Sequence, residues 1–407
     1  MTMKTKFKLA ATAVAAALAC IAGPAAAQVS DGVIKIGVMN DMSGLYADVT
    51  GPGSLLAARM AVEDFGAARK GMKVEVLSAD HQNKPDVGST LARTWYDVDK
   101  VDAIFDVPTS SVALAISQLT REKGKAFINS GAATSDLTGK ACSPNTIHWT
   151  YDTWMLANGT GSAIVKNGGD SWFFLTADYA FGHALERDTE AVVLKNGGKV
   201  LGKVRTPFPG SDFSSFLLQA QASKAKIIGL ANAGGDTINS IKQAAEFGIT
   251  KSGQNLAGLL VFLADVHGLG LQTAQGLLIT ETFYWDLNDE TRAWSKRFAA
   301  ANNNRYPTMV QAGVYGAVLH YLKAIEAGKT DDGTKVVAQM KKMPTDDPLF
   351  GKGTIRADGR KLHPAYLVEV KKPVESKGPY DYYKVRSQIP ADQAFRPEKE
   401  GGCSLVK

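Results

Sequence analysis

Val33-Ile34-Lys35-Ile36-Gly37-Val38 is an apolar run of strand length, bounded by Gly32 on one side and by polar residues from Asn40 on the other. Outward from this run, predicted helices and strands alternate in the order 54–65, 73–78, 87–97, 103–107, 111–122 and 126–128. An alternation of this kind predicts a parallel sheet with helices on both faces.

The same alternation restarts near residue 170. The predicted strands are 172–175, 199–204, 227–231, 259–263 and 276–282, and the predicted helices are 181–196, 213–222, 237–247, 290–303 and 311–327. A hairpin is expected over 353–370 with its turn at Asp358-Gly359, and the chain from Lys371 onward is expected to be mostly irregular. The fold class is therefore α/β, with two Rossmann-like lobes and a cleft where strands of both sheets end.

The length of 407 residues exceeds what one hydrophobic core usually holds, which also favours two lobes. We expect a first lobe from 28–149 and 282–349, and a second lobe from 150–281 and 350–372. Residues 373–407 form the expected C-terminal tail.

The N-terminus has the pattern of an export signal. Lys4, Lys6 and Lys8 precede an apolar run over 9–21, and small residues lead to an expected cleavage site after Ala27. Lipidation at Cys20 is the alternative, but the preceding leucine is one position too close for a good lipidation motif. The expected location is the periplasm.

The charge and the cysteine content further limit which class of protein this chain can be. The net charge is +6, and no run of five basic residues occurs, so a nucleic-acid partner is not expected. Without the signal, Cys142 and Cys403 remain, an even number for an oxidising compartment. We predict a disulfide between them, with two free thiols as the alternative.

Signatures of catalysis are missing from the sequence. It contains no nucleophile elbow, phosphate-binding loop or HExxH motif, and its six histidines are scattered. No catalytic residue, metal site or cofactor is therefore expected, and the chain is predicted not to be an enzyme.

Small hydroxyl residues follow two neighbouring strands. Ser110 and Ser111 come after strand 103–107 and open a helix, and Ala132, Ala133 and Thr134 follow strand 126–128. Free backbone N–H groups and hydroxyls at such positions bind carboxylates without an arginine. The alternative is that Ser110 and Thr134 are ordinary helix caps.

Aromatic residues at other strand ends are candidate walls of the same site. Tyr46 follows the first strand, and Tyr179 and Phe181 follow the strand at 172–175. Tyr151 lies where the chain is expected to cross between the lobes first. Each of them has packed core as its alternative.

These residues occur within motifs that resemble the branched-chain amino-acid binding proteins of ABC transporters. The resemblance extends in order along the whole chain after the signal. The matching segments are 34–38 with Ser43-Gly44 and Tyr46, Ala61-Val62-Glu63-Asp64, Val101-Asp102-Ala103-Ile104, Ser110-Ser111, Gly131 to Thr134, Asp178 to Gly182 and Asp212-Phe213-Ser214. The resemblance implies a type I periplasmic binding fold, with three crossovers between lobes that close around a ligand by hinge motion.

The resemblance also implies roles for particular residues. Ser110 matches the serine that binds the ligand carboxylate, and the 131–134 loop completes that site, although Ala133 stands where the family has threonine. In amino-acid binders an acidic residue of the second lobe holds the ammonium group. Further residues expected to contact the ligand are Asn232, Asp236, Asp265 and His267.

The chain further resembles a subgroup of this family that includes binders of aromatic acids. The resemblance lies in the 231–236 segment, in His148 to Tyr151 and in the C-terminal cysteine. The expected function is thus capture of a small carboxylate for an ABC importer, by a monomer that delivers it to a membrane permease. An aromatic acid of the hydroxybenzoate or cinnamate type is the predicted ligand. A branched-chain or other apolar amino acid is the alternative, and a sensor domain is the alternative of another class.

Overall fold

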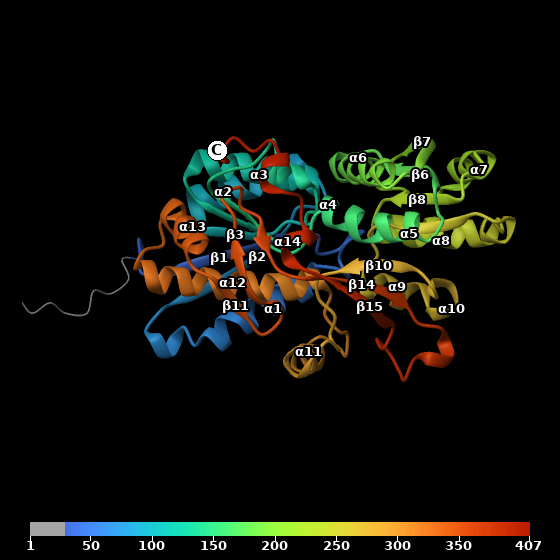
Figure 1. Ribbon diagram of the computed structural model, residues 1–407. Helices are drawn as coiled ribbons and strands as arrows, with labels where there is room; N and C mark the ends of the chain where they lie inside the picture. Colours follow the sequence, from blue (N-terminus) through green and yellow to red (C-terminus); the bar gives the residue numbers. More distant parts are fainter. Residues whose placement is uncertain (1–28) are drawn as a thin grey trace, which may run out of the picture.

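The computed structural model describes residues 29–407, which form two α/β lobes (Figure 1). The predicted signal segment, with Cys20 and Ala27, lies outside the described residues. The first lobe contains a five-stranded parallel sheet in the order β2-β1-β3-β4-β5. Its strands are β1 (Ile34–Asn40), β2 (Val74–Asp80), β3 (Ala103–Asp106), β4 (Ala126–Asn129) and β5 (Thr146–His148).

Helices cover both faces of this sheet. One face carries Ile34, Ile36 and Val38 and packs in one core with the helices α1 (Gly51–Phe65), α12 (Met309–Gly328) and α13 (Gly333–Lys342). The opposite face carries Met39 and Ile104 and packs with α2 (Pro85–Thr94) and α3 (Ser110–Lys123). Because successive side chains of a strand point to opposite faces, a strand buried on both sides is apolar almost throughout.

The second lobe repeats this architecture with a four-stranded parallel sheet in the order β7-β6-β8-β9. Its strands are β6 (Ser171–Ala177), β7 (Lys199–Thr206), β8 (Ile227–Ala231) and β9 (Asn255–Gly258). Trp172 and Phe174 face α6 (Ala180–Lys195), whereas Phe173 and Leu175 face the opposite core with α7 (Ser214–Ala222) and α8 (Gly235–Glu246). The predicted α/β class is confirmed.

Two smaller sheets complete the molecule. β10 (Leu278–Glu281), β14 (Ala365–Val370) and β15 (Tyr383–Ile389) form an antiparallel sheet. β11 (Thr345–Asp347), β12 (Gly351–Ile355) and β13 (Lys361–Leu362) form the other, which contacts α12 and α13 of the first lobe. The sequence had assigned residues 350–362 to the second lobe. The remaining α-helices are α4 (Thr153–Leu156), α5 (Ser162–Lys166), α9 (Leu263–Leu269), α10 (Leu271–Ala274), α11 (Asp289–Ala301) and α14 (Ala391–Ala394).

Two local predictions were wrong. The strand expected at 259–263 ends earlier, at Gly258, and α9 begins at Leu263 because the Asp265 carboxylate caps its first turn. The hairpin turn at Asp358-Gly359 joins β12 to β13, but β14 leaves to pair with β10 and β15. The tail from Lys371 is mostly irregular, as predicted, but it also contains β15, which pairs along β14. Its polar, largely exposed residues hide the strand pattern.

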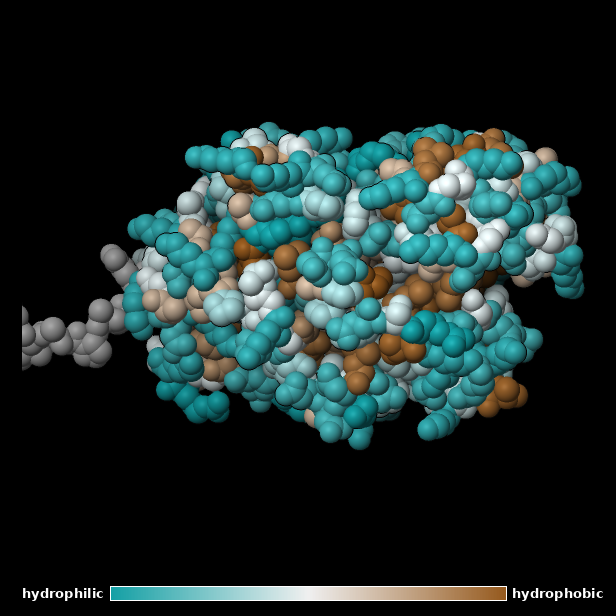
Figure 2. Space-filling view, in the orientation of Figure 1, coloured by the Kyte–Doolittle hydropathy of each residue, from teal (hydrophilic) through white to brown (hydrophobic). Residues whose placement is uncertain are grey.

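The predicted disulfide between Cys142 and Cys403 is confirmed. Figure 2 shows hydrophilic residues over most of one face, with hydrophobic ones gathered in a band through its middle, around β10. Within residues 29–407 we find no helix with the length and apolarity of a membrane span. The same part of the chain holds no group of three His, Cys, Asp or Glu side chains placed to bind a metal ion.

Candidate functional site

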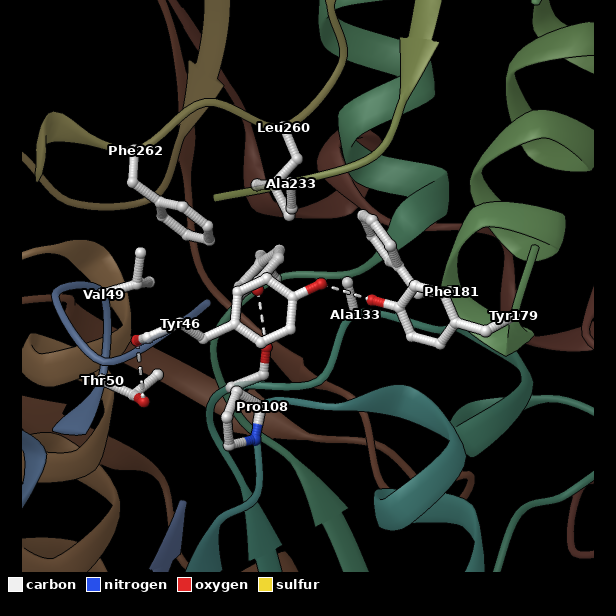
Figure 3. A pocket seen from close by; sticks show the side chains of 12 residues that line it. Tyr46, Val49, Thr50, Pro108, Ala133, Tyr179, Phe181, Ala233, Leu260 and Phe262 are labelled. Atoms are coloured by element: carbon white, nitrogen blue, oxygen red, sulfur yellow. Dashed lines mark hydrogen bonds between the residues drawn. The ribbon is translucent and has the colours of Figure 1, made fainter. Parts of the chain in front are cut away.

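A cavity lies between the two lobes, at the carboxyl ends of strands from both parallel sheets (Figure 3). The free space between its walls, counted together with open solvent, is about 290 Å³. Its lining comes from the segments after β1, β3 and β4 of the first lobe, from the first crossing, and from the segments after β6, β8 and β9 of the second. The lining residues are Tyr46, Val49, Thr50, Pro108, Gly131, Ala133, Tyr151, Tyr179, Phe181, Ala233, Leu260 and Phe262. Open α/β sheets bind their ligands at this edge.

The walls of the cavity are mainly aromatic. The hydroxyls of Tyr46 and Tyr179, from opposite lobes, are hydrogen-bonded at 2.6 Å. Behind Tyr179 lies the ring of Phe208, stacked on it with the ring centroids 3.8 Å apart. The Tyr151 hydroxyl donates to the Gly131 carbonyl at 2.6 Å, and its ring meets Phe262 edge-on. None of the lining residues is charged, so the cavity suits a flat apolar body with few polar groups.

Neutral hydrogen-bond donors lie at the first-lobe side of the cavity. Ser110 opens α3, is fully buried, and its hydroxyl accepts the N–H of Thr134 at 3.2 Å. Ala133 lines the cavity, and its N–H donates to no atom in the described part of the chain. The Thr134 hydroxyl caps a 3₁₀ turn by accepting the N–H of Asp136, so it performs the capping role that was the alternative for it.

Two other first-lobe candidates lie beside this group and do not line the cavity. Ser111 is half-buried in the first turn of α3. Ala132 is fully buried, and its carbonyl accepts hydrogen bonds from Asn129 and His148.

The second-lobe candidates Asn232 and Asp236 lie at the start of α8. Asn232 is bonded to Thr237 and Ser240, so its side chain is occupied in holding this helix end. Asp236 is buried; one carboxylate oxygen accepts the Gly210 N–H at 3.1 Å, and the other has no partner among the described residues. Burial raises the pKa of Asp236 to about 7.

Asp236 also lies close to the tyrosine pair. Burial raises the pKa of Tyr46 and of Tyr179 above the ordinary value, and the nearby Asp236 charge adds to both increases. The two phenols therefore stay neutral at ordinary pH. The polar end of the cavity on the second-lobe side is thus a pair of neutral hydroxyls backed by one carboxyl group.

Asp265 and His267 lie on α9, outside the residues that line the cavity. The Asp265 carboxylate accepts the N–H of Phe262 at 2.9 Å, which fixes the backbone that points Phe262 into the cavity. His267 hydrogen-bonds the Tyr382 hydroxyl at 2.8 Å, and its ring stacks on Tyr380 at 4.5 Å. His267 belongs to a neighbouring surface groove with Tyr306 and Tyr380.

Sequence reasoning found five of the side chains that line the cavity: Tyr46, Ala133, Tyr151, Tyr179 and Phe181. It missed Val49, Pro108, Leu260 and Phe262, among others. Leu260 and Phe262 were hidden because the strand before them was predicted to run through them. The signal that could have exposed them is Gly258, where the strand ends.

A family model described as "Periplasmic binding protein" matches residues 33–379. A periplasmic binding protein from Burkholderia mallei is 54% identical, with 93% of this chain and 100% of that one covered and a TM-score of 0.90. A branched chain amino acid ABC transporter periplasmic ligand-binding protein from Burkholderia xenovorans LB400 is 40% identical, with 92% and 100% covered and a TM-score of 0.81. A solute binding protein of an ABC transporter from R. palustris, in complex with benzoate, has a TM-score of 0.79 at 23% identity, with 92% and 100% covered, and shows the fold alone.

These similarities agree with the geometry: two lobes, a cavity at the strand ends of both sheets, and no catalytic group lining it. The prediction of a binding protein in place of an enzyme is confirmed by the family. The chain belongs to the periplasmic binding protein family.

Proposed function

We propose that this protein captures an aromatic carboxylate of the hydroxybenzoate or cinnamate type and delivers it to the membrane permease of an ABC importer. The observation that carries the proposal is the cavity itself: tyrosine and phenylalanine rings from both lobes around an uncharged interior. Aromatic rings stack or meet edge-on favourably, so a flat ligand gains more there than a branched aliphatic one.

The carboxylate of such a ligand would bind at the first-lobe side. The N–H of Ala133 has no acceptor of its own among the described residues, and Ser110 offers a buried hydroxyl at the N-terminus of α3. The positive end of the helix dipole and its free N–H groups stabilise an anion. No arginine is needed, in agreement with the uncharged lining.

A ring hydroxyl at the opposite end of the ligand would meet the Tyr46 and Tyr179 hydroxyls with Asp236 behind them. Since the pKa of Asp236 is about 7, this carboxyl group exists in both protonation states near neutral pH. A neutral hydroxyl, which both donates and accepts, is compatible with either state.

A branched-chain amino acid is the second candidate, because the B. xenovorans relative carries that description and because Asp236 has an oxygen with no partner among the described residues. An ammonium group beside Asp236 would hold the carboxylate ionised. The two candidates therefore differ in what they require of this residue.

The remaining parts of the proposal concern export and assembly. Residues 1–27 are proposed to be a cleaved signal, and the protein is proposed to work as a periplasmic monomer with lobes divided as the sequence predicts, except that 350–362 go with the first lobe. None of the other candidates lines the cavity, so their proposed contacts with the ligand require a rearrangement; these are Ser110, Ser111, Ala132, Thr134, Asn232, Asp236, Asp265 and His267.

The test is a thermal-shift and calorimetric titration with benzoate, 4-hydroxybenzoate, leucine and valine. We expect the aromatic acids to bind, and a ligand at about 100 times its Kd to stabilise the fold by about 2.7 kcal/mol. Stabilisation by leucine and valine alone would overturn the aromatic assignment in favour of the amino acid.

A matched pair of variants tests the carboxylate site. Ser110→Ala removes the hydroxyl proposed for the ligand and should weaken binding of the aromatic acid. Ser117→Ala removes a similarly buried hydroxyl about two turns further along α3, bonded to Thr146 at 2.8 Å and away from the helix N-terminus, and should leave binding unchanged.

A further inference from the structure

The C-terminal segment runs from one side of the molecule to the other. It leaves β15, which pairs with β14, passes through α14, and ends at Cys403, whose disulfide partner Cys142 follows the first-lobe 3₁₀ turn 135–138. The chain joins the lobes earlier near residues 149–152, 282–288 and 363–364. This segment is a fourth connection, and it is closed by a covalent bond.

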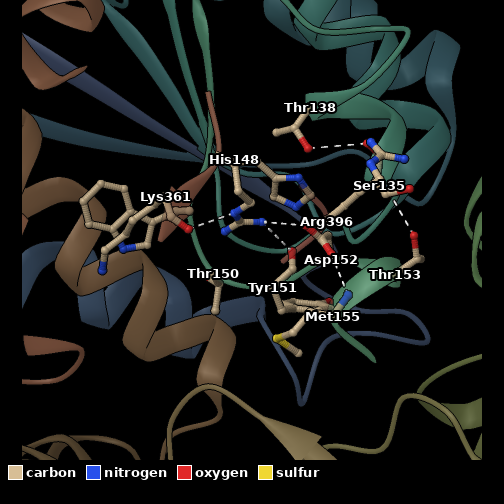
Figure 4. A network of polar contacts seen from close by, with 12 residues as sticks. Ser135, Thr138, His148, Thr150, Tyr151, Asp152, Thr153, Met155, Lys361 and Arg396 are labelled. Carbon is tan, nitrogen blue, oxygen red and sulfur yellow. Dashed lines mark hydrogen bonds and ion pairs between the residues drawn. The ribbon is translucent and has the colours of Figure 1, made fainter. Parts of the chain in front are cut away.

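The segment contacts both lobes along its path. On the second-lobe side the Asn158 amide donates to the Gln393 carbonyl at 2.9 Å. On the first-lobe side the Arg396 guanidinium donates to the Ser135 carbonyl at 3.0 Å (Figure 4). Between these contacts, Phe395 is buried and its ring packs against residues of the third crossing.

Phe395 covers the side chain that ties two crossings together. Its ring lies 4.4 Å from the Arg360 guanidinium carbon. Arg360 is fully buried, and it donates to the Tyr151 carbonyl at 3.2 Å and to the Asp152 carboxylate at 3.4 Å. The backbone is tied here too, because the His148 N–H donates to the Gly359 carbonyl at 2.9 Å.

Little apolar surface holds the end of the segment, and its hydrogen bonds lead to the residues around Arg360: Arg356 donates to the Arg396 carbonyl at 2.7 Å, and Glu398 accepts the Ala357 N–H at 3.0 Å. Between Ile389 and Cys403 the buried side chains are those of Ala394 and Phe395, and the others are exposed or half-buried. Burial of so little apolar surface holds a chain end weakly. The bond to Cys142 is therefore the covalent anchor, which supplements these hydrogen bonds in keeping Phe395 and Arg396 in place.

We infer that residues 390–403 are a disulfide-locked strap across the hinge, and that opening the bond with a dithiol loosens the hinge. The dithiol gives two electrons to the Cys142–Cys403 bond and is itself oxidised to a disulfide; each released sulfur takes up one proton. The freed end then lets the Phe395 ring move away from Arg360. The hydrogen bonds from Arg360 to Tyr151 and Asp152, which tie the first crossing to the third, then break and re-form more often. This inference does not depend on which ligand the cavity binds.

Hydrogen exchange of the full chain, read by mass spectrometry without ligand, tests the strap. The oxidised protein is compared with the same protein in dithiothreitol and with the Cys142→Ser/Cys403→Ser double variant. We expect exchange at residues 148–152 and 356–362 to become about tenfold faster without the bond. Peptides of β6 (171–177) should keep their rates, which separates a loosened hinge from general unfolding.

Two further proteins keep the test decisive if the double variant folds poorly. A chain ending at Ile389 lacks the strap and should match the reduced protein at the hinge peptides. Arg396→Ala keeps the disulfide and should show a smaller increase. Unchanged exchange at the hinge in both the reduced and the shortened protein would overturn the inference, whatever the ligand titration shows.

Discussion

Asp236 shows what burial does to one carboxyl group beside a binding cavity. Its one hydrogen bond comes from the Gly210 N–H, and no cation pairs with it in the described residues. Water is excluded, so the charged form loses solvation that a single amide does not replace. The group is costly to the fold, and this cost is in keeping with the ligand contact proposed for it.

The cost predicts a pH dependence. The pKa of Asp236 is about 7 in the folded protein, against 3.8 for the ordinary side chain, so the folded state holds a proton that the unfolded state releases between these values. The contribution of Asp236 to the free energy of unfolding should therefore fall as pH rises from about 4 to about 7, and it should stay level above that. Over this pH range, the free energy of unfolding of Asp236→Asn should decrease by up to about 4 kcal/mol less than that of the wild type.

Urea unfolding of the wild type and of Asp236→Asn at several pH values measures the difference. Asp106 and Asp265 also have pKa values raised to about 7 by burial, so both proteins keep part of the slope. The slope that distinguishes the two proteins belongs to Asp236 alone. Parallel curves would contradict the assignment.

At the residue scale the sequence placed Tyr46, Tyr179 and Phe181 correctly at the cavity because each follows a strand closely, and strand ends of one sheet share an edge. It left open whether the Thr134 hydroxyl binds a ligand or caps a turn, and it did not reveal that Asp265 holds Phe262. Short-range hydrogen bonds of this kind depend on the local backbone path, which residue types alone leave open.

Among the elements, α12 shows how a helix of the first lobe positions a crossing. Its residues are buried over nearly its whole length. At Gly313 the helix has no side chain, so Thr150 of the first crossing can pack directly against it. A Cβ at Gly313 would lie 2.0 Å from the Thr150 Oγ1 and 3.1 Å from its Cβ. The glycine is required there because the Thr150 side chain packed against the helix leaves no room for a methyl group.

We predict that Gly313→Ala destabilises the protein by ~1–3 kcal/mol, because the added methyl overpacks this contact in spite of its better helix propensity. Gly328→Ala is the matched control at the end of the same helix, where the nearest atoms lie 3.6–3.8 Å from the new Cβ. Chemical unfolding should separate the two variants. Equal free energies of unfolding of the two variants would show that the first crossing shifts to make room for the added methyl group.

At the scale of the whole molecule, the hydrogen bond between Tyr46 and Tyr179 joins the lobes across the cavity mouth. Lobe closure in hinged proteins is a balance between such contacts and the freedom of the open state. Tyr179→Phe leaves the ring stacked on Phe208 but removes the inter-lobe bond.

We expect Tyr179→Phe to shift the ligand-free protein toward open forms, by roughly 1 kcal/mol or about fivefold in the open-to-closed ratio. Small-angle X-ray scattering should report a larger radius of gyration. Tyr96→Phe is the control, since its hydroxyl bonds Thr120 at 2.8 Å within the first lobe. A scattering curve that changes equally in both variants would argue against a closing role for Tyr179.

The sequence by itself determined the α/β class, the paired sheets, the disulfide partners and the strand ends that face the cavity. These follow from periodicity, from an even cysteine count and from the rule that parallel strands end at one edge, all of which are local or topological. Only the tertiary structure decided that β15 extends a sheet, that Phe262 enters the cavity, and that Asp236 lies by the Tyr46–Tyr179 bond. Each joins segments far apart in the chain, and such distances are set by how the two lobes pack together.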